Sequence, residues 1–140
     1  TSAKENAFIN GFEKKIEFVQ ADVFDYLPQV ESLKPAPYDF IILDPPAFTK
    51  SRKTALDAVR GYTEINSRAM KALPRGGYLA TCSCSHFMEE KMFVKMLKNA
   101  SEYAGVSLRL IKACAQSPDH PELMSVPETK YLKFYLLQIT

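Results

Sequence analysis

The chain has 140 residues, 46% of them hydrophobic and 24% charged, with a formal net charge of +2. This length and composition are typical of one globular domain with one core. No apolar run approaches the roughly 20 residues of a membrane-spanning helix, and no signal peptide precedes the first predicted helix, so we expect a cytoplasmic protein without membrane contact. Three cysteines argue against a disulfide scaffold, and Cys82 and Cys84 with a distant Cys114 are a poor zinc pattern, so no metal is expected.

The first part of the chain predicts two helices with one strand between them. Residues 2–10 have a helical pattern that Gly11 ends, because glycine readily adopts the left-handed conformation of a helix C-cap. Residues 16–20 alternate apolar and polar side chains, which predicts a strand. Asp22 is a suitable N-cap for a short helix over residues 23–30.

The rest of the chain alternates strand and helix patterns almost to its end. The predicted elements are a strand at 38–43, a helix at 56–73, a strand at 78–82, a helix at 88–103, and strands at 107–113 and 131–139. Because no helix separates the last two strands, we expect them to form an antiparallel hairpin. The whole pattern predicts an α/β fold: a mostly parallel sheet with an antiparallel last strand and helices on both faces.

The strand at 38–43 carries the most informative local signal. It is too short for a helix, is rich in Ile, Leu and Phe, and ends abruptly in Asp44-Pro45-Pro46. Proline has no N–H to donate and fixes its own φ, so the strand must end there. Ligands of open α/β sheets bind at the carboxyl ends of the strands. Asp44 is therefore predicted to lie at a ligand-binding edge, the alternative being a strand that simply ends in a turn.

Two thiols follow the next strand at the same predicted edge. Gly76-Gly77 leads into an apolar strand that ends in Cys82 and Cys84. Alternation places both thiols on one face of the strand, and the later position of Cys84 favours its exposure. A carboxylate beside a thiol at this edge suggests covalent chemistry. The alternative for either cysteine is a small buried hydrophobic residue, which is also the interpretation of Cys114.

Positive charge is concentrated directly after the Asp-Pro-Pro segment. Only Asp57 and Glu64 oppose the basic residues of this region, which are Lys50, Arg52, Lys53, Arg60, Arg68, Lys71 and Arg75. Such an excess can attract a polyanion, and a solvated helix face is the equally weighted alternative.

Several segments together resemble a known family. They are Lys4-Glu5-Asn6 with Asn10-Gly11, Asp22-Val23-Phe24, Asp44-Pro45-Pro46-x-Phe48, Arg60-Gly61-Tyr62 with Ile65-Asn66, Ser83-Cys84-Ser85, Asp119-His120-Pro121, and Pro127-Glu128 with Tyr131-Leu132-Lys133. In this order they resemble the class I S-adenosylmethionine-dependent RNA methyltransferases, and most of all the bacterial 23S ribosomal RNA cytosine-C5 methyltransferases that carry a PUA domain. The resemblance implies a Rossmann-like methyltransferase sheet, S-adenosyl-L-methionine as cofactor and ribosomal RNA as partner.

The same resemblance implies a cofactor site on the first half of the chain. Asp22 would hydrogen-bond the adenine, with Val23 and Phe24 beside the ring; the alternative for Asp22 is an N-cap alone, and both roles can hold at once. Asp44 and Pro45 would complete the site at the end of the strand.

For the reaction, the resemblance implies a cysteine adduct with a flipped cytosine. C5 of cytosine is a poor nucleophile, and a thiolate that attacks C6 makes C5 able to accept a methyl group. Cys84 is the predicted nucleophile; Cys82 is its rival, because Thr81-Cys82-Ser83 resembles the same segment in a wider group of cytosine-C5 enzymes. Asp44 would assist with a proton at N3 after the base leaves the stack.

The substrate would be held by residues that follow Asp44. Pro46 fixes the edge, and Phe48 either stacks on the base or packs in the core. The candidate phosphate contacts are Lys50, Arg52, Lys53 and Arg60, and Arg60 can instead pair with an acidic residue of the fold.

The amino-terminal part departs from the family pattern. The glycine-rich loop after the first strand, the acidic residue after the second strand and the PUA domain are missing. We therefore expect residues 1–140 to be the C-terminal part of a methyltransferase domain, inactive alone, with an exposed strand edge that favours homo-oligomers. Two other functions stay open: an N-methyltransferase acting on guanine or adenine in RNA, and a non-catalytic fragment that serves in assembly or RNA binding.

Overall fold

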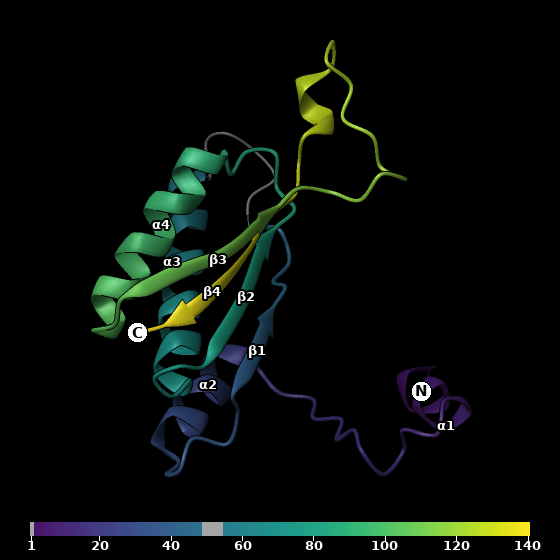
Figure 1. The fold of residues 1–140 in the computed structure, drawn as a ribbon, viewed down its shortest axis with the longest axis vertical. Coiled ribbons are helices and arrows are strands. Elements are labelled where there is room, and N and C mark those ends of the chain that lie inside the picture. Colours follow the sequence, from purple (N-terminus) through teal and green to yellow (C-terminus); the bar gives the residue numbers. More distant parts are fainter. Residues whose placement is uncertain (1, 49–54) are drawn as a thin grey trace.

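The computed structural model of the chain describes residues 2–48 and 55–140, and Figure 1 shows how they are arranged. The elements in chain order are α1 (Ser2–Ile9), α2 (Val23–Ser32), β1 (Phe40–Leu43), α3 (Ala55–Ala72), β2 (Tyr78–Ser83), α4 (Glu90–Ala104), β3 (Leu108–Cys114), the 3-10 turn η2 (Pro127–Thr129) and β4 (Lys133–Ile139). Apart from the strand predicted at 16–20, the predicted elements are present, with ends that differ by a few residues.

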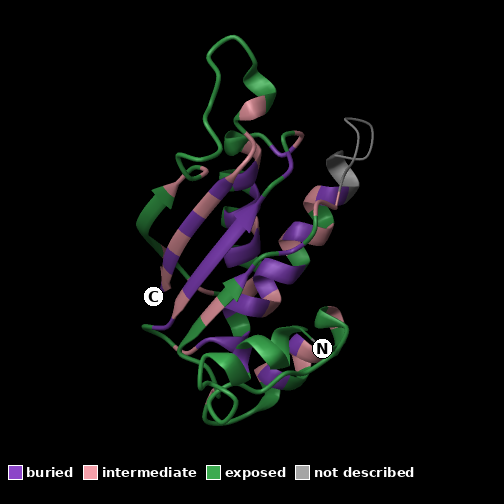
Figure 2. Cartoon of the chain, turned by 90° about the vertical axis from the view of Figure 1, so that its right-hand side faces the viewer, coloured by how far each residue is buried: buried purple, intermediate pink, exposed green. Residues whose placement is uncertain are grey.

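The four strands form one sheet in the order β1-β2-β4-β3. β1 and β2 are parallel, and β4 is antiparallel to both of its neighbours, β2 and β3. Three strands therefore run in one direction and the last strand of the chain runs against them. The predicted mostly parallel sheet with an antiparallel last strand is confirmed. β4 lies between β2 and β3 rather than at the outer edge, so β2 is an interior strand and is buried along almost its whole length (Figure 2).

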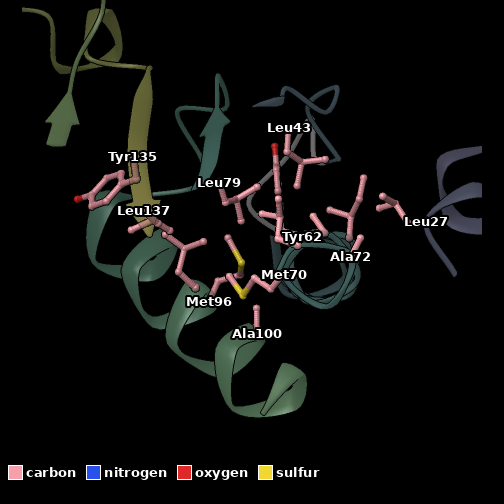
Figure 3. Packing of buried hydrophobic residues seen from close by; sticks show 14 of the residues in the cluster. Leu27, Leu43, Tyr62, Met70, Ala72, Leu79, Met96, Ala100, Tyr135 and Leu137 are labelled. Atoms are coloured by element: carbon pink, nitrogen blue, oxygen red, sulfur yellow. The ribbon is translucent and has the colours of Figure 1, made fainter. Parts of the chain in front are cut away.

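The hydrophobic core lies between the sheet and the pair α3 and α4 (Figure 3). Tyr62 and Met70 of α3 and Met96 of α4 are fully buried against Leu79 of β2. The amphipathic pattern of both helices explains this arrangement, because each turns its apolar stripe toward the strands. Gly105 ends α4 in the left-handed conformation, with φ of 67°, as its position after the last apolar turn requires.

The expectation of helices on both faces of the sheet is wrong for α1. This helix lies apart from the sheet, joined to α2 by an extended connection (Figure 1). Gly11 follows it with φ of 70°, so the predicted C-cap is present. α2 packs against α3, so it joins the same helical layer as α3 and α4.

The strand predicted at residues 16–20 is also wrong. These residues have no regular structure, and Ile16, Phe18 and Val19 are all exposed. Alternation of apolar and polar side chains shows which face of a strand would be buried, but a strand forms only where a neighbour completes its hydrogen bonds. Among the described residues, β1 pairs only with β2, so residues 16–20 have not added to its outer edge.

A buried hydrogen bond between α3 and β2 generates a prediction for stability. Thr81 donates from Oγ1 to Oδ1 of Asn66 at 2.7 Å, and both residues are fully buried. Asn66→Leu leaves the hydroxyl of Thr81 without its acceptor, so we expect a loss of about 1–3 kcal/mol in the free energy of unfolding, measured in urea. Thr81→Val added to Asn66→Leu should recover part of that loss, because both polar partners are then gone.

Thr63→Val is the matched control. Thr63 donates to the carbonyl of Val59 within α3, so its loss leaves no cross-element partner unpaired. The single variants Asn66→Leu and Thr81→Val each lose some free energy of unfolding. If the loss in the double variant equals the sum of these two losses, Asn66 and Thr81 are not coupled.

Candidate active site at the carboxyl edge of the sheet

The parallel pairing of β1 and β2 brings a carboxylate and a thiol into contact. Leu43 is in register with Thr81, so the next residues of the two strands, Asp44 and Cys82, also lie side by side. The thiol of Cys82 donates to Oδ1 of Asp44 at 3.1 Å, and the carbonyl oxygen of Leu43 is 3.6 Å from the same sulfur. The predicted meeting of Asp44 with a cysteine at one edge of the sheet therefore holds for Cys82.

The surroundings of Cys82 keep its thiol protonated. Only 7% of the residue is exposed. Burial, followed by the hydrogen bond to Asp44 and the negative charges of Asp44 and Cys84, raises the pKa of Cys82 to about 12. A thiol in this state is a hydrogen-bond donor, and both its burial and the charge of Asp44 oppose formation of a thiolate there.

Cys84 lies just past the end of β2 and is exposed. The residues before and after it are buried and held. Ser83 donates from Oγ to the hydroxyl of Tyr62 at 3.1 Å, and the backbone N–H of Ser85 donates to Oγ of Ser83 at 3.4 Å. An exposed thiol thus stands on an anchored turn, which agrees with the prediction that Cys84 is the more accessible of the two.

A cavity of about 550 Å³ opens between the start of α2 and the end of β1. Its lining residues are Asp22, Val23, Phe24, Leu27, Ile41, Ile42, Leu43, Asp44, Pro45, Pro46, Phe48 and Ile65. All five residues predicted to bind the cofactor belong to this set, although Asp22 and Asp44 are 22 positions apart in the sequence. Oδ1 of Asp22 accepts from the N–H of Phe24 at 2.8 Å, so Asp22 is also the N-cap of α2.

Phe48 combines the two roles that the sequence left open. It lines the cavity, and its ring meets Tyr62 edge-on with centroids 4.7 Å apart. The place where a Cβ on Gly61 would stand is 3.6 Å from the Phe48 ring, so Gly61 allows α3 to pack closely against this ring. Pro46 is exposed beside it.

Among the described residues, no lysine or arginine lines this cavity. Arg60 lines a separate cavity of about 520 Å³ on the helical layer, together with Arg68 and Lys71. There Arg68 forms an ion pair of 2.7 Å with Glu64. The predicted contacts Lys50, Arg52 and Lys53 lie outside the described residues.

Sequence reasoning assigned no role to Lys133, which the structure places against the turn that carries Cys84. The residue is 6% exposed and lies opposite Ser83 in the pairing of β2 with β4. β4 alternates buried and half-buried residues, starting at Lys133. A lysine at the inward position of such an alternation is unusual, because ammonium groups are rarely buried without partners. That signal was present in the sequence.

Within residues 2–48 and 55–140, no three His, Cys, Asp or Glu side chains gather in a way that suits a metal ion. The same part of the chain contains no helix long and apolar enough to cross a membrane.

The fold is that of the Rossmann-like methyltransferases. SMU.776, described as a candidate methyltransferase and crystallised with SAH, superposes with a TM-score of 0.75 at 16% identity, covering 99% of this chain and 37% of that chain. TrmN from Thermus thermophilus superposes with a TM-score of 0.57 at 24% identity, covering 99% of this chain and 32% of that chain.

Two curated relatives are more similar in sequence, and both are named ribosomal RNA large subunit methyltransferase I. The protein of Aeromonas salmonicida is 39% identical over 132 residues, and that of Vibrio vulnificus is 37% identical over 141 residues. The alignments cover 94% and 99% of this chain but 33% and 35% of the relatives. The chain thus spans about a third of the length of the curated relatives it matches. No family model matches the chain.

The contact of Cys82 with Asp44 generates a second prediction. Asp44→Asn removes the negative charge that opposes the thiolate, so the pKa of Cys82 should fall below 12. Burial is the larger cause and remains, so the value should stay above that of an ordinary cysteine. The Cβ chemical shift of ¹³C-labelled cysteine, followed against pH, measures this directly.

Asp39→Asn is the control for the Asp44 variant, since Asp39 lies at the opposite end of β1. An unchanged titration of Cys82 in Asp44→Asn would show that the contact with Asp44 has no electrostatic effect on the thiol.

Proposed function

We propose that this chain is part of an enzyme that transfers a methyl group from S-adenosyl-L-methionine to C5 of a cytosine in ribosomal RNA through a cysteine adduct. The single observation that carries the proposal is the contact between Asp44 and Cys82, with the exposed Cys84 one residue past the end of the same strand. The names of the relatives support ribosomal RNA as the substrate class.

The cavity beside α2 fits the adenosine part of the cofactor. Its walls are mainly apolar, as a flat aromatic ring requires, and the carboxylates of Asp22 and Asp44 lie at its edge as acceptors for N–H or O–H groups. Val23 and Phe24 would contact the adenine ring, and Pro45 would close the site toward the sheet. When bound there, the cofactor supplies the methyl group.

The exposed Cys84 is the proposed nucleophile toward C6 of the cytosine. Attack of its thiolate on C6 forms the C6–S bond while N3 takes a proton from Asp44, which must be protonated at that step, so that C5 gains electron density and accepts the methyl group. A base then removes the C5 proton, N3 returns its proton to Asp44, and the C6–S bond breaks to release the thiolate and restore the ring. Phe48 and Pro46 would hold the flipped base, since base and aromatic faces stack well.

Cys82 is the alternative nucleophile, but its thiol is harder to deprotonate than an ordinary cysteine. Its pKa of about 12 means that it must first lose its proton to Asp44 or to another base, while Cys84 faces solvent. The protonated Cys82 suits a supporting role, in which its S–H orients the carboxylate of Asp44.

The remaining parts of the proposal concern the larger protein. Residues 1–140 would be the C-terminal part of a methyltransferase domain in a cytoplasmic enzyme with a PUA domain. The proposed phosphate contacts are Lys50, Arg52, Lys53 and Arg60, of which Arg60 is exposed on α3.

One observation favours N-methylation of guanine or adenine as a second candidate. Asp44 is exposed, and its carboxylate can accept a hydrogen bond from an amino group without help from a thiol. In that reaction neither cysteine forms a bond to the substrate.

Cysteine variants distinguish cytosine-C5 methylation from N-methylation. They are made in the longer protein that contains this chain and matches its relatives in length. Cys84→Ser should lower methylation on the order of 10³-fold or more, since it removes the nucleophile. It should also abolish the stable complex with RNA that carries 5-fluorocytidine, in which fluorine replaces the C5 proton whose loss releases the enzyme. The complex is measured by denaturing gel electrophoresis.

Cys82→Ser is the matched variant and should still form the complex. A complex that needs Cys82 and not Cys84 would exchange their roles. Full activity in both variants would exclude covalent catalysis and leave N-methylation.

We also propose that the chain self-associates through the outer edge of β1. Among the described residues, this edge has no paired strand, and Ile42 is 71% exposed on it. An exposed apolar edge is a template for another strand, and a lysine there opposes pairing.

Light scattering coupled to gel filtration tests the association. The wild-type chain should exceed the monomer mass at high concentration, and Ile42→Lys should return it to the monomer. Val94→Lys is the control, because Val94 is also an exposed apolar residue but lies on α4, away from the strand edge. A monodisperse wild-type monomer at high concentration would contradict the proposal.

A further inference from the structure

Lys133 is a buried cation next to the turn that carries the candidate nucleophile Cys84. It has no role in the chemistry proposed above. Its Nζ donates to the carbonyl oxygen of Ser85 at 2.5 Å and to that of Tyr131 at 2.6 Å. An ammonium group has three N–H donors, so one remains after these two bonds. The side chain is buried and hydrogen-bonded, so its place in the fold is defined.

These bonds fix the turn that carries Cys84. The residue before the cysteine, Ser83, is paired with Lys133 across the sheet and bonded to Tyr62. The residue after it, Ser85, gives its carbonyl oxygen to the ammonium of Lys133. Cys84 is thus the exposed residue between two anchored neighbours, and Lys133 contributes to both anchors.

The side chain of Lys133 lines a cavity of about 290 Å³ together with other titratable residues. They come from the turn after β2, from the N-cap and first residue of α4, and from η2 and the residue after it: His86, Glu89, Glu90, Glu128 and Lys130. Burial lowers the pKa of Lys133 to about 8, while the negative charges of Cys84 and Glu90 act in the opposite direction. Tyr135, on the same face of β4, donates to Glu90 at 2.8 Å.

We propose that Lys133 is a positioning residue, which holds the Cys84 turn through the carbonyl of Ser85 and stabilises the thiolate of Cys84 by its charge. The role of that thiolate as nucleophile rests on the proposed function. The effect of Lys133 on the thiol itself does not. Because the interaction is mutual, a charge on Cys84 favours the ammonium as much as the ammonium favours the thiolate.

The test uses the 140-residue chain and needs no methyl transfer. Iodoacetamide alkylates thiolates, and fragment-ion mass spectrometry assigns the modification to each cysteine. Lys133→Met keeps the length of the side chain and removes its charge. Lys112→Met on β3 is the control, because Lys112 is an exposed lysine of the same sheet. Cys114 is the internal reference, since it is opposite Phe134 and so faces away from Lys133.

At about pH 7 we expect Cys84 to react about five-fold more slowly in Lys133→Met than in wild type, as for the loss of one nearby charge at the protein surface. The sign follows from the pKa of Lys133 of about 8. Its charge is present below that pH and lost above it, so the difference should disappear by about pH 10. Lys112→Met should match wild type, and Cys114 should react equally in all three proteins.

A difference that stays constant with pH would overturn the effect of the charge, since it would show that Lys133 acts on the shape of the turn alone. Equal rates at pH 7 would overturn the proposal as a whole. If Lys133→Met does not fold, Cys84→Ser gives the reciprocal measurement. Loss of the thiolate should lower the pKa of Lys133, followed by the ¹³Cε shift of labelled lysine, and an unchanged titration would overturn the proposal.

These outcomes are independent of the cysteine variants described above. Lys133 can fail to influence Cys84 while Cys84 remains essential for methylation. It can also stabilise a thiolate in a protein whose methylation does not need Cys84.

Discussion

The parallel pairing of β1 with β2 is the contact on which the candidate site depends. A one-residue shift of this register would move Cys82 away from Asp44 and turn every side chain of one strand to the other face. The register is held because both strands are fixed from the helical layer. Leu79 of β2 and Leu43 of β1 are buried in the same core as Tyr62. The chemistry at the edge is thus a consequence of apolar packing lower in the sheet.

α3 links the core to the site through polar groups on its buried face. Asn66 accepts from Thr81 in the middle of β2, and Tyr62 accepts from Ser83 at its end. Successive inward positions of one strand are therefore bonded to successive turns of one helix. The burial of Tyr62 raises its pKa, so its hydroxyl remains neutral and able to take part in these bonds. Through this ladder, the packing of α3 determines where the turn around Cys84 stands.

Local signals in the sequence were sufficient to predict most of the helices and strands, and to place Asp44 at the edge of the sheet. Asp44 could be placed because two prolines end a strand wherever they occur, and α4 could be ended because Gly105 permits a left-handed residue. The strand prediction at residues 16–20 was wrong because alternation is a local pattern, whereas a strand also needs a pairing partner elsewhere in the chain. The same limit applied to Lys133. One of its acceptors is the carbonyl of Tyr131, two residues before it, and the other is the carbonyl of Ser85, in a turn 48 residues earlier. No spacing rule connects those positions before β4 is known to lie beside β2.

The two thiols show how one strand can give equal residues unequal chemistry. Alternation alone treats Cys82 and Cys84 as equivalent, since both occupy positions of one parity. The strand ends between them, at Ser83, and the environment changes with it. Cys82 remains inside, where the carboxylate of Asp44 and the loss of water both oppose its ionisation. Cys84 is outside, where water solvates a thiolate and the charge of the buried Lys133 acts on it. A single residue of strand length therefore separates a thiol suited to donating a hydrogen bond from one suited to attacking a base.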